Sequence, residues 1–354
     1  MISFPSLKRG NPLIPLCGLM LCIWLLTFYM RAEEAPTNDG GPTTVGPPRE
    51  RIVKKPEVAP AQPPEPKFTT PSHEVGVVVA SLKKENTTWI EQQLPRAWVP
   101  SIYIVDDPTA KLTVPLNKGR EAMVYLTYII DNYYSLPDVS LFIHASRFAW
   151  HNDNPDYDSL ASLLSLQIPY VKSEGYVNLR CVWTLGCPTE FRPIEDVNPG
   201  WKDFRKSHPP NGHTVTTKEV YKQSFEELLP GEDVPEKVGV SCCAQFAVSK
   251  ERLRTRKREE YVRWRKWLLE TPLVDEVSGR VFEYMWHVIF GKEGVFCPSA
   301  EECYCKVYGW CNLKECTKVG CDKWYTLPKY ATLPQGWPLV GWEKEERNFS
   351  GPHL

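Results

Sequence analysis

The sequence lacks the signatures of several common functional classes. Its 42 Lys and Arg residues are balanced by 43 Asp and Glu residues, and the formal net charge of −1 gives no support for a nucleic-acid partner. No His-Glu-x-x-His motif is present, which excludes that form of zinc site. Cysteine is scarce in the first half of the chain, where only Cys17 and Cys22 occur. What distinguishes the chain is one long apolar run and a cysteine-rich second half.

The long apolar run lies near the N-terminus. Leu13 to Met30 carries no charged residue and is near the minimum length that spans a bilayer. Lys8 and Arg9 precede it, so the positive-inside tendency places residues 1–12 in the cytosol and the rest of the chain in the lumen. We predict a transmembrane signal anchor at 13–30 and a single-pass type II membrane protein. A cleaved signal peptide is the alternative, because small residues follow the run.

Residues 31–72 contain almost no large apolar side chains and are rich in Pro, Gly and Thr. Such a segment cannot bury enough surface to offset the entropy of ordering it. We therefore predict an extended, disordered stalk that acts as a spacer between the anchor and the domain that follows.

Cysteines and sequons both indicate the secretory pathway. The ten cysteines from Cys181 to Cys321 are an even number that can pair in an oxidising compartment. Asn86 and Asn348 begin Asn-x-Thr and Asn-x-Ser sequences, which are acceptors for N-glycosylation. We expect a location on the lumenal side of the Golgi or endoplasmic reticulum, with the cell surface or secretion as the alternative.

The luminal domain, residues 73–296, alternates between strand and helix patterns. The β-branched run Val75–Ser81 predicts a central first strand, residues 85–94 predict a short helix, and residues 101–105 predict a second strand. A helix with apolar residues at helical spacing begins near Asn117, and Val139–Ile143 reads as a strand buried on both faces. This β-α-β-α-β order predicts an α/β fold with a single, mainly parallel sheet flanked by helices. Further helices are predicted at 159–170, 217–229, 250–269 and 278–291, and strands at 178–183 and 238–249.

Two polar groups of this region fall where open α/β sheets bind ligands. Asn117 is a good N-cap, and Arg120 sits in the first predicted turn, where an anion could use its guanidinium and the free backbone N–H groups. Glu121 lies near the positive end of the same helix dipole. His144 falls at the carboxyl end of a strand. A solvated arginine and a structural histidine are the alternatives.

The pair Asp106-Asp107 follows the second predicted strand. Two carboxylates at that edge could hold a hard cation or a ribose. An Asp-Asp-Pro chain reversal is the alternative, and we favour it.

The loop from Ser146 to Tyr157 combines an aromatic ring with charged and imidazole groups. Arg147, Trp150, His151 and Asp153 are the types that grip polar, ring-shaped ligands. A metal site formed by His144, His151 and Asp153 is the alternative, but no internally spaced ligand motif supports it, and no metal is expected.

Later segments add a candidate base. Gln245 lies in an apolar strand and needs a partner in the protein or in a ligand. Glu283 and His287 are one turn apart on a predicted helix, an arrangement that suits a general base with a helper. Trp286 lies between them and is explained equally well as a core aromatic residue. The basic residues from 252 to 266 predict a solvated helix face.

Residues 297–354 form the last predicted region. Six cysteines fall between Cys297 and Cys321, and the luminal setting favours disulfides over a zinc knot because the spacing matches no standard ligand pattern. We predict a disulfide-rich cap followed by a C-terminal segment that wraps the surface.

Four separated motifs, in order, resemble a known family. NKGREAMVYLTYII, FIHASRFAWHND, CCAQFAVS and SGRVFEYMWHVIFG are similar to the mostly fungal family of domain of unknown function 3431, over about Val75 to Cys321. No reaction is assigned to that family. The β-rich start, the Gln245 strand and the sequence from Glu283 to Trp286 also resemble, more distantly, nucleotide-sugar transferases with the single α/β domain called GT-A. The branching N-acetylglucosaminyl type has a comparable Gln-aromatic strand and a downstream acid as base.

The distant resemblance implies a function. We expect a glycosyltransferase-like protein that moves a sugar from a nucleotide-sugar donor to a glycan or protein hydroxyl, without a divalent metal, since no clear Asp-x-Asp motif is present. The donor side would comprise Asn117, Gly119, Arg120, Asp106 and Asp107, and the sugar or acceptor side His144, Arg147, Trp150, His151, Asp153, Gln245 and Trp286. Glu283, aided by His287, would take the acceptor proton.

Two other functions stay open at this stage. A non-catalytic carbohydrate-binding or cell-surface ectodomain would use the same aromatic loop. A hydrolase would need two facing carboxylates, and nothing in the sequence pairs Glu283 with a second one.

Overall fold

The computed structural model describes residues 74–153, 157–183, 185–196 and 215–311, together with 340 and 346. All of them belong to the unit Pro66–Leu354. The predicted cytosolic tail, membrane anchor and stalk lie outside the described residues, as do Asn348 and nearly all of the predicted wrap. Within the described part of the chain, no helix is long and apolar enough to cross a membrane.

A five-stranded sheet lies at the centre of the fold, in the order β2-β1-β3-β6-β4. β1 pairs in parallel with β2 and β3, whereas β6 runs antiparallel to both β3 and β4. The predicted α/β fold with a mainly parallel sheet is therefore confirmed. The strands are β1 Val75–Ser81, β2 Trp98–Ile104, β3 Val139–His144, β4 Tyr176–Asn178 and β6 Phe246–Ser249.

Side chains of the sheet alternate between two apolar cores. Val78 and Phe142 belong to one core, whereas Val77, Val79 and Ile143 belong to the other. This alternation is what a strand buried on both faces requires, because successive side chains point to opposite faces. The sheet is thus the middle layer of three.

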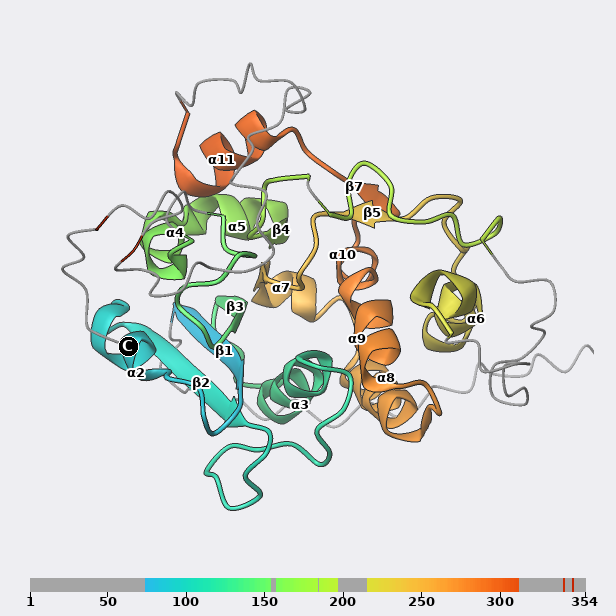
Figure 1. The fold of residues 1–354 in the computed structure, drawn as a ribbon, viewed down its shortest axis with the longest axis horizontal. Coiled ribbons are helices and arrows are strands. Elements are labelled where there is room, and N and C mark those ends of the chain that lie inside the picture. The colour runs from blue at the N-terminus through green and yellow to red at the C-terminus, as the bar shows by residue number, and fades with distance from the viewer. Residues whose placement is uncertain are drawn as a thin grey trace, which may run out of the picture. The chain divides into compact units, whose positions relative to one another are not determined.

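Helices cover both faces of the sheet (Figure 1). The first core includes side chains of α3, α6, α8, α9 and α10, and the second includes side chains of α2, α4, α5 and α11. The helices are α2 Thr88–Gln93, α3 Ala122–Asn132, α4 Ser159–Ser165, α5 Ile168–Glu174, α6 Thr217–Leu228, α7 Lys250–Leu253, α8 Arg258–Glu270, α9 Asp275–Glu283, α10 Trp286–Ile289 and α11 Ala300–Tyr308. A small parallel pair, β5 Gly239–Val240 and β7 Val295–Phe296, lies beside them.

Helix α3 begins later than its sequence predicts. The backbone of Gly119 (φ 71°) and Arg120 (φ 52°) is left-handed, so the helix starts at Ala122 and Asn117 is not its N-cap. Asp275 stabilises this entry by accepting the backbone N–H groups of Gly119 (2.5 Å) and Arg120 (3.3 Å). A residue distant in sequence thus decides where the helix starts.

The segments predicted as strand 238–249 and helix 278–291 are each divided. Cys243 (φ 86°) and Ala244 (φ 48°) have left-handed backbone, and they separate β5 from β6. α9 ends at Glu283, and α10 begins only at Trp286. These breaks could not be predicted from the sequence, because the apolar pattern continues across each of them. The predicted helix 250–269 is likewise split into α7 and α8.

Disulfides connect the C-terminal segment to the α/β domain. Cys181 pairs with Cys303 and Cys187 pairs with Cys297, while a local bridge joins Cys305 to Cys311. The predicted disulfide bonding near the C-terminus is confirmed for these residues, and α11 packs into the second core beside the bridges.

Candidate functional site

A cavity of about 360 Å³ opens at the carboxyl ends of β1 and β3. Its wall also includes the residue after β2, the approach to α3 and the first residue of α9. The parallel register pairs Ala80 with His144, so β1 and β3 end at the same level and their following residues meet. The polar residues of the wall include Asn117, Arg120, Glu121, His144, His151 and Asp275.

Several predicted site residues share this cavity. Arg120 comes from the entry to α3, His144 from the end of β3, and His151 from the loop that follows. The Trp150 ring is not among the lining groups. It lies beneath the guanidinium of Arg180, whose carbon is 5.0 Å from the ring centroid.

Asp275 occupies the backbone N–H groups that were predicted to bind an anion at the start of α3. Its carboxylate already accepts the N–H groups of Gly119 and Arg120 that were expected to be free. Gly119 also packs closely, because an added Cβ would lie 2.6 Å from a methyl carbon of Leu268. The guanidinium of Arg120 is exposed and can still receive an anion.

Two carboxyl groups interact beside Arg120. Withdrawal from water raises the pKa of Glu121 to about 8, and the charge of Glu283 adds to this effect. Burial also raises the pKa of Glu283, against the opposing effects of the Cys243 N–H, which donates to it at 2.6 Å, and of Arg280. Glu121 therefore retains its proton near neutral pH, and the two groups titrate as a coupled pair.

Glu121 and Asp275 are wall residues that sequence reasoning did not assign to a site. The sequence places Glu121 near the positive end of a helix dipole. An acidic residue at the start of a largely buried helix is the sequence feature that could have indicated a site. No local pattern around Asp275 indicated a contact with Gly119, which is 156 positions away.

Two half-buried histidines form a pair in the cavity wall. Nδ1 of His144 lies 2.6 Å from Nε2 of His151. Burial lowers the pKa of His144 to about 4, a change that the Cys243 backbone opposes, and burial lowers the pKa of His151 still more clearly. Both rings are therefore neutral at pH 7, and one donates its N–H to the other.

Gln245 holds this pair in place. Its Oε1 accepts the backbone N–H of His144 at 3.1 Å, and its Nε2 donates to the Asn152 side chain at 3.1 Å. The partner that a buried glutamine needs is thus found in the protein, and Gln245 links β6 to the loop after β3.

Arg147 and Asp153 are buried in structural contacts. Arg147 binds both carboxylate oxygens of Asp158, at 2.8 and 2.7 Å. Asp153 accepts the backbone N–H groups of Cys181 and Val182. The sequence Asp156-Tyr157-Asp158 has Asp-x-Asp spacing, but Arg147 engages its second carboxylate. Neither Arg147 nor Asp153 lines the cavity.

His287 and Trp286 also lie away from the cavity. Nε2 of His287 is 3.0 Å from the Gly294 carbonyl oxygen, and burial lowers the pKa of His287 to about 4. Trp286 stacks on Phe290 within the first core. The prediction that His287 shares a helix face with Glu283 is wrong, because α9 and α10 are separate helices.

Asp106 and Asp107 form the predicted turn. Asp106 accepts the backbone N–H of Lys83 at 2.7 Å, and Asp107 accepts the Thr109 N–H at 2.9 Å and pairs with Nζ of Lys83. These bonds lower the pKa of Asp107 to about 2. Asn86, the described glycosylation candidate, is exposed.

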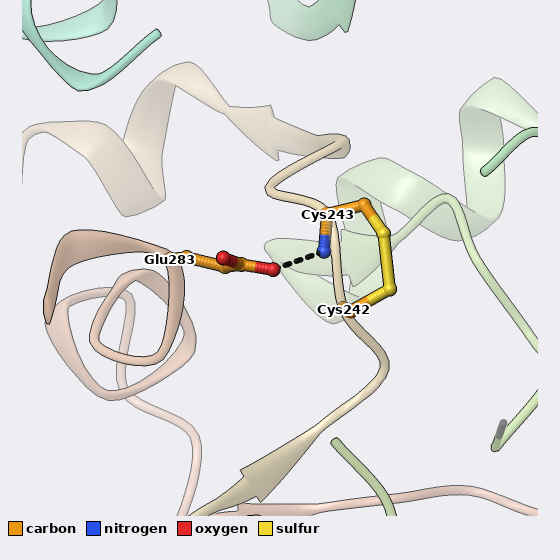
Figure 2. Close-up of side chains that lie close together, drawn as sticks. All are labelled: Cys242, Cys243 and Glu283. Carbon is orange, nitrogen blue, oxygen red and sulfur yellow. Dashed lines mark hydrogen bonds between the residues drawn. A yellow bond between two sulfur atoms is a disulfide. The ribbon is translucent and has the colours of Figure 1, made fainter. Parts of the chain in front are cut away.

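A second polar cluster joins the end of α9 to the loop before β6 (Figure 2). Cys242 and Cys243 form a disulfide with each other, and Glu283 points to the backbone N–H of Cys243. Ligand-type atoms of these three residues lie within 4.8 Å of one another. Because the two sulfur atoms are bonded to each other, they are not thiolate ligands in this state.

The profile of the DUF3431 family, described as a protein of unknown function, matches residues 77–306. This range is well over half of the chain, and the chain therefore belongs to that family. The match spans the cavity, the histidine pair and the Cys242–Cys243 disulfide. No curated protein and no solved structure matches the chain.

Proposed function

We propose that the domain is a GT-A-like glycosyltransferase that takes a sugar from a nucleotide-sugar donor. The observation that supports this most directly is the cavity at the carboxyl strand ends, where Arg120 lies beside the carboxyl group of Glu121. Ligands of open α/β sheets bind at this edge. The cavity volume of about 360 Å³ lies near the lower end of the range of ligand-binding pockets.

The donor diphosphate would bind through Arg120. Its guanidinium is exposed at the cavity wall and carries the fixed positive charge that phosphate oxygens prefer. The backbone N–H groups at the start of α3 contribute little to diphosphate binding, because they already donate to Asp275. Asn117, on the same approach to α3, offers an amide to the neighbouring hydroxyl groups.

Glu121 and Glu283 would handle the acceptor proton. A base works best when its pKa lies near the working pH, and both carboxyl groups have raised pKa values. Of the two, only Glu121 lines the cavity, so its ionised form would accept the proton of the acceptor hydroxyl, and the share of that form grows as the pH approaches 8. Glu283 is not among the residues that line the cavity, and its charge adds to the effect of burial on the pKa of Glu121.

A hydrolase is the second candidate, because the structure supplies the carboxyl pair that the sequence alone did not. Glycoside hydrolysis uses one protonated and one ionised carboxyl group, and a pKa of about 8 suits Glu121 to the protonated role. The two reactions are separated by their products, since a hydrolase releases free sugar from a glycan without a nucleotide. A non-catalytic carbohydrate-binding module would release nothing.

We further propose that the domain faces the lumen of the secretory pathway behind an N-terminal anchor. Disulfides that join segments more than a hundred residues apart form in oxidising compartments, which supports this location. Asn86, exposed on the domain, supports it as well. A glycan or glycoprotein acceptor would be encountered there.

Thermal shift with a panel of nucleoside diphosphates tests the proposal. We expect at least one diphosphate to raise the melting temperature of the full chain, because a ligand that binds only the folded state stabilises it. Arg120→Asn should abolish the shift, since asparagine tolerates left-handed backbone and removes only the charge. Arg96→Asn is the matched control on an exposed arginine outside the cavity. Silence across the panel would contradict the transferase proposal.

A further inference from the structure

The disulfide between Cys242 and Cys243 joins adjacent residues (Figure 2). The stabilising effect of a disulfide grows with the length of chain that it closes, so this one restrains almost nothing in the unfolded state. The two bridges that hold the C-terminal segment, in contrast, join residues 122 and 110 positions apart. Global stability therefore does not explain the adjacent pair.

A buried arginine faces both sulfur atoms. Nη1 of Arg180 lies 2.7 Å from Sγ of Cys242 and 3.0 Å from Sγ of Cys243. Arg180 is only 5% exposed, and Asp153 lies 3.7 Å from its Nε. A guanidinium in such a position stabilises a thiolate once the disulfide opens. It also opposes a metal cation at the same sulfur atoms.

The two cysteines differ in access. Cys243 is half-buried, whereas Cys242 is 1% exposed. An incoming thiolate therefore reaches Sγ of Cys243, and Cys242 is the sulfur that leaves. The leaving sulfur is the one closer to Arg180, and exchange is faster when the leaving thiolate is stabilised.

We propose that Cys242 and Cys243 form a reversible thiol–disulfide site that small-molecule thiols reduce and whose state controls the hydrogen bond on Glu283. A thiolate RS⁻ attacks Cys243, the S–S bond breaks, and Cys242 leaves as a thiolate beside Arg180. A second RS⁻ attacks the mixed disulfide and releases RSSR. Two thiols RSH are oxidised to RSSR, and the cysteine pair gains their two electrons and two protons.

Reduction changes the environment of Glu283. The disulfide form holds Cys243 and Ala244 in left-handed backbone, which is disfavoured for residues other than glycine. Opening the small ring lets Cys243 leave this conformation, and its N–H then moves away from the Glu283 carboxyl group. This coupling follows from the loop geometry alone and holds whether or not the domain transfers sugars.

Alkylation after graded reduction tests the site on the full-length chain. The protein is equilibrated with increasing reduced glutathione, quenched with N-ethylmaleimide and digested with trypsin, which places both cysteines on the peptide of residues 238–250. We expect that peptide to gain two labels at a glutathione concentration about tenfold lower than the peptide of residues 181–202, which carries both Cys181 and Cys187. Labelling of both peptides at the same glutathione concentration would overturn the proposal. A disulfide from Cys242 or Cys243 to another cysteine would also overturn it.

Variants at Arg180 test its part in the exchange. Arg180→Met should slow labelling of the peptide by about threefold to tenfold, because the leaving thiolate loses its positive partner. Arg180→Lys keeps a charge and should restore most of the rate, and it covers the case in which Arg180→Met fails to fold around Asp153. Arg96→Met, on an exposed arginine, should leave the rate unchanged. Equal labelling rates in Arg180→Met and the parent protein would show that Arg180 does not stabilise the leaving thiolate.

Infrared difference spectra report on Glu283 directly. Reduction should produce a carboxyl band that is absent in Glu283→Gln, because the oxidised form alone supplies the Cys243 N–H. A spectrum without that band, recorded while the pair is fully labelled, would contradict the coupling to Glu283.

Discussion

The backbone N–H of Cys243 donates a hydrogen bond of 2.6 Å to the carboxyl group of Glu283. It joins the end of α9 to the loop that leads into β6. The charge of Glu283 in turn raises the pKa of Glu121 in the cavity wall. A backbone donor outside the cavity thus influences the protonation of a group inside it.

Glu121 should make the domain less stable as the pH rises. Its pKa is raised from 4.5 to about 8, so the folded state binds more protons than the unfolded state between these values. The free energy of unfolding should therefore fall across that window and level off above it. Glu121→Gln should lose this fall and be more stable than the parent at pH 9, as measured by urea denaturation at a series of pH values. Glu91→Gln, on an exposed acid, is the control, and a parallel pH profile for Glu121→Gln would contradict the pKa direction.

Arg147→Met should destabilise the domain by about 3–5 kcal/mol, because it leaves the Asp158 carboxylate buried without its charged partner. Replacing both residues, as Arg147→Met with Asp158→Asn, should recover a large part of the loss. Arg96→Met should change the stability by less than about 0.5 kcal/mol. A similarly small effect for Arg147→Met in chemical denaturation would show that Arg147 is not structural and would restore it as a candidate ligand-binding residue.

Gln245→Leu should cost about 1–3 kcal/mol, since the backbone N–H of His144 and the amide of Asn152 both lose a buried partner. The same variant should weaken any nucleotide-induced thermal shift by loosening the His144–His151 pair. Gln92→Leu, at an exposed position, is the control for the change in side-chain type. Unchanged stability of Gln245→Leu would mean that the glutamine is not needed inside the protein and faces a ligand.

Two strands of the sheet could be predicted from sequence because their patterns are local, whereas only Asn178 of the predicted strand 178–183 lies in a strand, at the end of β4. The β-branched run of β1 and the apolar run of β3 depend on neighbouring residues, and both elements lie where their patterns indicated. The meeting of Arg120 and His144 followed from topology, since parallel strands end at one edge. These inferences needed no knowledge of distant contacts.

The remaining features depend on residues far apart in the sequence. The left-handed entry to α3 is stabilised by Asp275, and the break before β6 carries contacts from Arg180 and Glu283. No periodicity in either segment reveals these partners. The same limit explains why Glu283 could not be paired with Glu121 from sequence, because their interaction becomes visible only when α3 and α9 are packed together.

The position of β6 constrains the order in which the domain can assemble. β6 lies between β3 and β4 and is the only strand with which β4 pairs in the described sheet, although β4 precedes it by about seventy positions. During synthesis, β1, β2 and β3 can associate as soon as they emerge, but β4 must wait until residue 249 has left the ribosome. The segment from 176 onward is then the part of the nascent chain that most needs protection from aggregation.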